Sequence, residues 1–196
     1  MDIHHSCRWD NLGWGAVMER ARRLFGLLIV LIVAGVVILV VTVRPGLRKD
    51  SESVDTSWAP LVQPLDARFK TLDAVVTQLK NDGAATRTAT VGLVRLLERW
   101  RVIRAGTDTA DQVTTANRIE EYAARVSALA LTPRLAGAVP LRDALGAFEK
   151  SRSTIGAQLD AYNASVSTYQ HQRDAFWSQI VAQLDDYPMR PTLQLS

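Results

Sequence analysis

The sequence has few residues of the kinds that build catalytic or metal sites. It contains one cysteine, Cys7, and therefore no intramolecular disulfide framework. Its three histidines are His4 and His5, near the start, and His171, on a polar face of a predicted helix. The sequence has no paired-cysteine, HExxH, GxSxG or phosphate-binding glycine motif. We therefore expect no catalytic residues, no metal ion and no organic cofactor.

Long runs of positive charge are also missing. The net charge is only +3, and no block of basic residues follows Lys49. A nucleic-acid-binding protein is expected to carry a basic stripe or a recognisable module. We therefore expect no nucleic-acid partner.

The sequence does have one long hydrophobic run. Residues 24–43, LFGLLIVLIVAGVVILVVTV, include no charged side chain. At about 1.5 Å per residue, a helix of this length crosses the roughly 30 Å hydrocarbon core of a bilayer. A cleaved signal peptide has a shorter apolar region and a small-residue cleavage site, and a buried core helix needs a larger protein around it. The run predicts a single-pass anchor in the cell membrane.

The basic residues beside the anchor favour one orientation only slightly. They are Arg8, Arg20, Arg22 and Arg23 before it, and Arg44, Arg48 and Lys49 after it. We expect the N-terminus in the cytoplasm and the domain outside. Residues 1–23, with Trp9 and Trp14, are typical of a tail at the membrane–water interface. After the anchor, Pro45 and Gly46 predict the end of the helix, and residues 44–56 a charged linker.

From Ser57 onward, apolar residues recur at steps of three and four, the spacing of one helix face. At one helix start, Thr109 and Gln112 match a capping box. The pattern includes no strand alternation. Residues 57–187 are expected to form an all-α, antiparallel up-and-down bundle of about four long helices, followed by a short tail, 188–196. The predicted helices cover about 57–80, 85–105, 109–129 and 141–185.

The fourth predicted helix has the most regular pattern. From Leu141 its seam residues alternate at four and three, which predicts one continuous helix with coiled-coil-like packing. Arg152 and Arg173 are charged members of this seam, for which we expect a structural ion pair or a snorkelling stem. Tyr162 and Tyr169 are either core residues with hydroxyls at the bundle edge or a ligand platform. The seam could also pair between copies, which leaves a homo-oligomer open.

The run Tyr162-Asn163-x-x-Val166-x-x-Tyr169 resembles a motif of the LemA family of bacterial membrane proteins. In that family the last long helix carries Tyr-Asn-x-x-Val-x-x-Tyr-Asn. Ile155 before the motif and Phe176 after it fit the same pattern. Gln170 replaces the second asparagine of the motif, so the resemblance is to a divergent member.

Two earlier segments resemble the same family. Val54-Asp55-x-x-Trp58, followed by Leu65, Arg68 and Leu72, is similar to the family's opening segment after its anchor. Residues 132–136, TPRLA, are similar to its Tyr-Pro-x-Leu-Lys-Ala turn, whereas Trp177 stands where the family usually has proline. The resemblance covers about residues 53–176 and implies an up-and-down bundle on a single-pass anchor. It implies no activity, because the family has no established reaction.

These observations favour a membrane-anchored scaffold or interaction protein that is not an enzyme. The alternative is an accessory subunit of a larger membrane transport or secretion complex, which docks through its anchor and tail. An enzyme would need a pocket with convergent titratable groups, and the sequence offers only scattered ones. The expected partners are membrane lipid and other membrane or envelope proteins.

Overall fold

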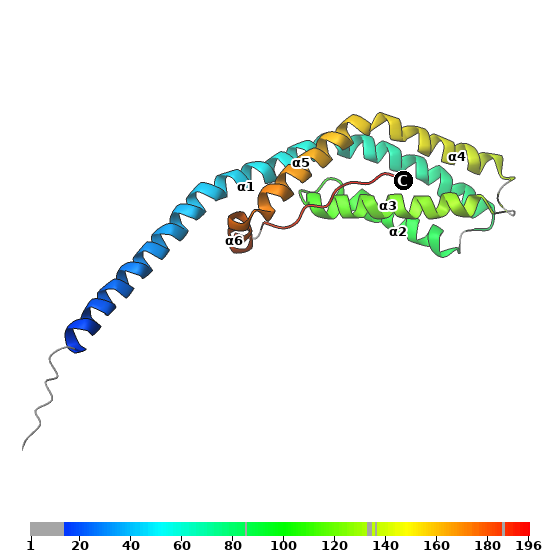
Figure 1. Cartoon of the computed structure of the whole chain (residues 1–196). Coiled ribbons are helices and arrows are strands. Elements are labelled where there is room, and N and C mark those ends of the chain that lie inside the picture. Colours follow the sequence, from blue (N-terminus) through cyan, green and yellow to red (C-terminus); the bar gives the residue numbers. More distant parts are fainter. Residues whose placement is uncertain (1–13, 85, 133–134, 136, 186) are drawn as a thin grey trace, which may run out of the picture. The chain divides into compact units, whose positions relative to one another are not determined.

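The protein is all-α (Figure 1). The computed structural model describes residues 14–84, 86–132, 135, 137–185 and 187–196, with their side chains except those of 14–21, 23 and 177. The described residues contain no strand. The chain forms two compact units, residues 1–45 and residues 46–196.

The helix α1 (Trp14–Asn81) begins in the first unit and continues into the second, and it is the one described helix that is long and apolar enough to cross a membrane. Most of its large apolar side chains from Leu24 to Val41 are exposed, as lipid-facing side chains would be, whereas Leu39 and Val40 are partly buried. The expected interfacial tail falls largely outside the description, because residues 1–13, with Trp9, and the side chain of Trp14 are not described.

The predicted break at Pro45 and Gly46 is wrong, because α1 continues through both residues to Asn81. A proline inside a helix costs about 3 kcal/mol. Packing offsets this cost, since Leu47 and Val54, both in the predicted linker, are fully buried and each such side chain contributes about 1.5–3 kcal/mol. Gly46 also leaves room for Gln172, whose Nε2 would clash with a Cβ there. Residues 46–56 therefore belong to the bundle.

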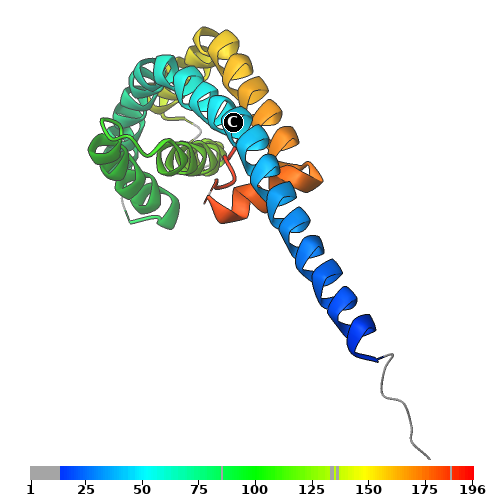
Figure 2. The same cartoon turned by 90° about the vertical axis from the view of Figure 1, so that its left-hand side faces the viewer.

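The second unit is the expected up-and-down bundle. The later part of α1 is followed by α2 (Thr88–Ile103), α3 (Thr109–Ala130) and α4 (Val139–Lys150), which alternate in direction (Figures 1 and 2). After α1 the chain turns at Asp82 and Gly83, and Gly83 has a positive φ of 74°. The apolar stripe on α1 is buried and packs in one core with residues of α2 and α3. The stripe consists of Trp58, Leu61, Leu65, Phe69, Leu72, Val76 and Leu79.

The predicted continuous fourth helix is wrong. After α4 the chain forms a 3₁₀ helix, η1 (Ser151–Thr154), then α5 (Gly156–Asp174) and α6 (Phe176–Leu184). In η1, the hydroxyls of Ser151, Ser153 and Thr154 each donate to a carbonyl three residues back. Such side-chain bonds compete with the α-helical ladder. At Ala175 the backbone is extended, with ψ 137°.

These interruptions change which seam residues are buried. Ile155, Tyr162, Val166 and Tyr169 lie in the core as predicted, whereas Arg152 is exposed on η1. After the extended residue the register shifts, so that Phe176 is 69% exposed. In α6, Val181 and Ala182 are buried, and Ile180 of the predicted seam is exposed.

Candidate functional site

The predicted short tail, residues 188–196, packs against the bundle. Residues 187–196, here called the C-terminal segment, lie in no helix or strand and pass alongside the bundle (Figure 1). Side chains of α1, α3 and α5 bond the segment, and the surface that these side chains form is here called the groove. Leu193 of the segment is 1% exposed and belongs to the hydrophobic core. Since the predicted motif residues lie along this groove, it is the candidate site.

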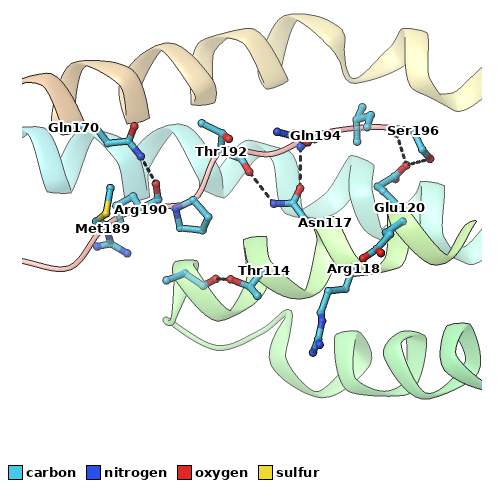
Figure 3. Close-up of a pocket in the computed structure, with 14 residues that line it drawn as sticks. Thr114, Asn117, Arg118, Glu120, Gln170, Met189, Arg190, Thr192, Gln194 and Ser196 are labelled. Atoms are coloured by element: carbon cyan, nitrogen blue, oxygen red, sulfur yellow. Dashed lines mark hydrogen bonds between the residues drawn. The ribbon is translucent and has the colours of Figure 1, made fainter. Parts of the chain in front are cut away.

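Besides Asn163, described below, four side chains of α5 bind main-chain carbonyls of the C-terminal segment. Three of these bonds come from neutral groups of the motif region. The hydroxyl of Tyr169 donates to Pro188 at 2.7 Å and that of Tyr162 to Pro191 at 2.8 Å. The amide of Gln170 donates to Arg190 at 2.7 Å (Figure 3).

The fourth is charged, because Arg173 Nε donates to the carbonyl of Tyr187 at 3.0 Å. Its Nη1 also pairs with Asp174 at 3.2 Å. Arg173 therefore has a structural partner, as expected of a cation in the seam.

Two asparagines bind the backbone of the segment in two-point fashion. Asn163 on α5 donates to the carbonyl of Leu193 at 3.0 Å and accepts its N–H at 2.9 Å. Asn117 on α3 donates to the carbonyl of Thr192 at 2.7 Å and accepts the N–H of Gln194 at 2.8 Å (Figure 3). Only an amide offers a donor and an acceptor side by side in this way. The pair fixes an extended backbone irrespective of its side chains.

The bundle also binds the side chain of Arg190, the charged residue of the segment. Arg190 Nη2 lies 3.1 Å from Asp55 Oδ2 and 3.3 Å from Ser51 Oγ, both on α1. The carboxylate is 45% exposed, and a pair of this kind contributes only about 0.2–1 kcal/mol. The pair therefore selects the register of the segment more than it stabilises the fold.

Trp58 supports the groove from below. Its ring packs against Tyr162, with centroids 5.1 Å apart, and its Nε1 donates to Gln112 Oε1 at 2.5 Å. Gln112 also donates to the carbonyls of Ile103 and Gly106. The predicted capping box is therefore wrong, because the side chain of Gln112 bonds these groups. The cap of α3 is Asp108, whose carboxylate accepts the N–H of Asp111.

A buried ion pair closes the other end of the groove. Arg68 binds Glu120 through Nε at 2.7 Å and Nη2 at 2.8 Å, with side chains 0% and 2% exposed. Arg68 also donates to the carbonyl of Phe148 and stacks on its ring. Glu120 Oε2 accepts the N–H and the hydroxyl of Ser196 (Figure 3). The pair joins α1, α3, the end of α4 and the segment.

Burial shifts the acid–base equilibrium of both motif tyrosines. Desolvation raises the pKa of Tyr162 and of Tyr169, although the positive charge of Arg190 lowers it in part. Both hydroxyls therefore stay protonated at neutral pH and act as donors. This protonation state matches their role as donors to the segment.

An open pocket of about 900 Å³ lies between α3 and the C-terminal segment (Figure 3). Its lining includes Arg118 and Glu121 of α3 and Met189 of the segment. In the described part of the chain, no group of three or more His, Cys, Asp or Glu residues could hold a metal ion. The pocket has the mixed polarity of a binding surface.

The structure gathers most predicted residues at this groove. Asp55, Trp58, Tyr162, Asn163 and Tyr169 contact the segment or support it, and Ile155 and Val166 lie in the core beneath it. Phe176 lies apart, exposed on α6. In the turn at 132–136, Leu135 is buried, and Pro133, Arg134 and Ala136 lie outside the described residues.

The residues of the groove that the sequence analysis missed include Asn117, Glu120 and Arg190. A signal for Glu120 exists, since it lies between the buried Ala116 and Ala123 on one helix face. Asn117 and Arg190 carry no such signal, because their partners are more than 70 positions away.

Comparison of the chain with protein families, with curated proteins and with solved structures found no match.

Proposed function

We propose that this chain is a membrane-anchored helical-bundle scaffold that binds other membrane or envelope proteins and has no catalysis of its own. The observation that carries the proposal is the groove. Its tyrosine hydroxyls and amides, the groups that a reaction would require to be accessible, are bonded to the backbone of the C-terminal segment. In this arrangement these groups serve to hold an extended backbone.

The anchor part of the proposal is supported by the exposed apolar side chains of α1 between Leu24 and Val41. In this proposal the anchor lies in the cell membrane, the N-terminus is cytoplasmic, and the bundle lies on the outer side of that membrane. We also propose that the chain is a divergent member of the LemA family, on the strength of the motif around Tyr162 and Asn163. The motif then serves to bind an extended segment.

The orientation can be tested with the single native cysteine. In intact cells, a membrane-impermeant maleimide should not label Cys7, which is cytoplasmic in this proposal. In a Cys7→Ser background, Lys80→Cys at the exposed end of α1 should be labelled. The reverse pattern would place the bundle in the cytoplasm and overturn the orientation.

The binding role can be tested by purification in mild detergent from native membranes. We expect membrane or envelope proteins to co-purify with the full chain and to be depleted when residues 1–44 are removed. Turnover of a small-molecule substrate, or a stoichiometric metal or cofactor in the purified protein, would contradict the non-catalytic proposal.

A second candidate is an accessory subunit of a larger membrane transport or secretion complex. The observation that favours it is an exposed apolar stripe on α6, formed by Phe176, Ile180 and Leu184 at four-residue steps. This candidate predicts one stable complex of fixed composition after purification. The scaffold predicts partners of variable composition.

A further inference from the structure

The groove binds the C-terminal segment much as a receptor binds an extended peptide. Side chains from three helices bond its backbone or its arginine without any helix or strand ladder: Ser51, Asp55, Arg68, Asn117, Glu120, Tyr162, Asn163, Tyr169, Gln170 and Arg173. Backbone bonds of this kind supply affinity in peptide recognition, and a few side-chain pockets supply specificity.

We base the specificity of this groove on two positions of the segment, and Leu195 and the hydroxyl of Ser196 make further side-chain contacts with the bundle. Arg190 reaches the carboxylate of Asp55, and Leu193 is buried in the core. The exposed side chains of Met189, Thr192 and Gln194 lie outside these two contacts. The groove therefore recognises an extended chain with an arginine three residues before a leucine.

We propose that the groove is a binding site for an extended peptide of this pattern, and that the C-terminal segment of a second copy of the chain occupies it by exchange. The inference rests on the proposed role as an interaction protein. It does not depend on the anchor, because all the contacts involved lie within residues 46–196.

A second copy is the occupant because each copy carries the segment that this groove fits. The same hydrogen bonds and the same Arg190–Asp55 pair form whether the segment comes from the same chain or from another. Only the short stretch after α6 joins the segment to the bundle. Exchange of an identical element between protomers is a low-cost route to a dimer.

A charge-reversal experiment tests the exchange on the full chain. One copy carries Asp55→Arg, so that its own Arg190 is repelled from its groove. A second copy, with a different affinity tag, carries Arg190→Asp, so that its segment is repelled from its own Asp55. Across the two copies, each segment meets a groove of opposite charge. The chain with both substitutions restores the pair within one molecule and is the matched control.

Limited proteolysis of the segment gives the first result. Each single variant alone should be cleaved roughly fivefold faster than the unaltered chain, because a favourable pair is replaced by a repulsive one. The chain with both substitutions should return to the unaltered rate. If it does not return, the Arg190–Asp55 pair does not hold the segment, and the assigned groove is wrong.

Pull-down of the co-expressed copies gives the second result. Purification through one tag should recover the other copy at near equal amounts, with both segments protected. The control uses the same two tags on two copies that each carry both substitutions. In these copies each segment can pair with its own groove, so charge does not favour exchange between copies. If the single variants stay separate while the double variant regains protection, the segment is bound only within its own chain, and the exchange is overturned.

A photo-crosslinker identifies the contact itself. Placed at Thr192, whose side chain is exposed, on the Asp55→Arg copy, it should link to the α3–α5 groove of the other copy. Placed at Lys80, it should give no such link. If this link forms but no envelope protein co-purifies with the chain, the proposed function is contradicted and the exchange is not.

Discussion

At the scale of single residues, Arg68 and Glu120 interrupt apolar helix faces and meet each other in the core. Each ion loses its hydration there, and the penalty is several kcal/mol per ion. The geometry compensates, since the guanidinium makes two parallel bonds to the carboxylate and a third to Phe148. Such a pair fixes how elements dock, because misaligned helices would leave a buried charge unpaired.

Removing one partner of this ion pair should lower the free energy of unfolding more than replacing both partners by apolar residues. Arg68→Met should lower the free energy of unfolding of residues 46–196 by about 3–5 kcal/mol, because Glu120 remains buried without its partner. The double variant Arg68→Met, Glu120→Met should be more stable than Arg68→Met alone. Urea unfolding followed by circular dichroism measures both. A double variant less stable than the single one would contradict the pairing.

The motif tyrosines should make stability fall at alkaline pH. Because the pKa of Tyr162 and Tyr169 is raised on folding, the folded state favours the protonated hydroxyls. Their contribution is fully present below the unfolded pKa of about 10 and is lost as pH rises towards the folded pKa. The variant Tyr162→Phe, Tyr169→Phe should therefore lose less stability than the parent between about pH 9 and pH 11.

The same double variant should already be weaker at neutral pH. It lacks two hydrogen bonds to the carbonyls of Pro188 and Pro191, each with a net value of about 1 kcal/mol. Urea unfolding at several pH values separates the two effects. An identical slope of stability against pH in parent and variant would contradict the assignment.

At the scale of elements, the last helical stretch has two different registers. Through α5 the seam keeps the heptad positions Tyr162, Val166 and Tyr169 in the core. The extended residue Ala175 then rotates the next helix, so that α6 buries Val181 and exposes Phe176. The element boundary decides the environment of each later residue, although the spacing in the sequence is unchanged.

This difference in register gives a matched pair of variants. Val166→Asp places an unpaired carboxylate in the core and should cost several kcal/mol. Phe176→Asp, at a position that a continuous helix would have buried, should change stability by about 1 kcal/mol or less. Thermal unfolding of residues 46–196 compares them. Equal losses of stability in the two variants would contradict the change of register at Ala175 and support one continuous helix.

At the scale of the whole molecule, α1 combines two roles in one helix. Residues 24–43 form an apolar run long enough to cross a membrane, and residues from Leu47 onward contribute to the hydrophobic core of the bundle. The apolar run requires an apolar environment, whereas the bundle has a hydrophobic core of its own. We therefore expect each unit to fold without the other.

A charge in the middle of the apolar run tests the first of these roles. Val33→Arg should cost about 2.5–3.5 kcal/mol of insertion free energy. Glycosylation-site mapping of membrane insertion measures the inserted fraction, and Lys80→Arg, outside the run, is the control. Unimpaired insertion of Val33→Arg would argue against a membrane centre at this position.

The sequence by itself determined the apolar run, the helical character and most of the core. These features depend on local composition and on spacing within one helix, as in the stripe from Trp58 to Leu79, and both are readable without knowledge of partners. The motif residues Tyr162 and Tyr169 were also identifiable, but their hydrogen-bond acceptors were not.

Only the tertiary structure decided where helices end and what the groove holds. Local rules place a break at Pro45 and Gly46, yet burial of Leu47 and Val54 outweighs the cost of the proline. The segment from Tyr187 has no pattern of its own. It is ordered by bonds to residues up to 139 positions away, and such long-range partners leave no periodic signal in a sequence.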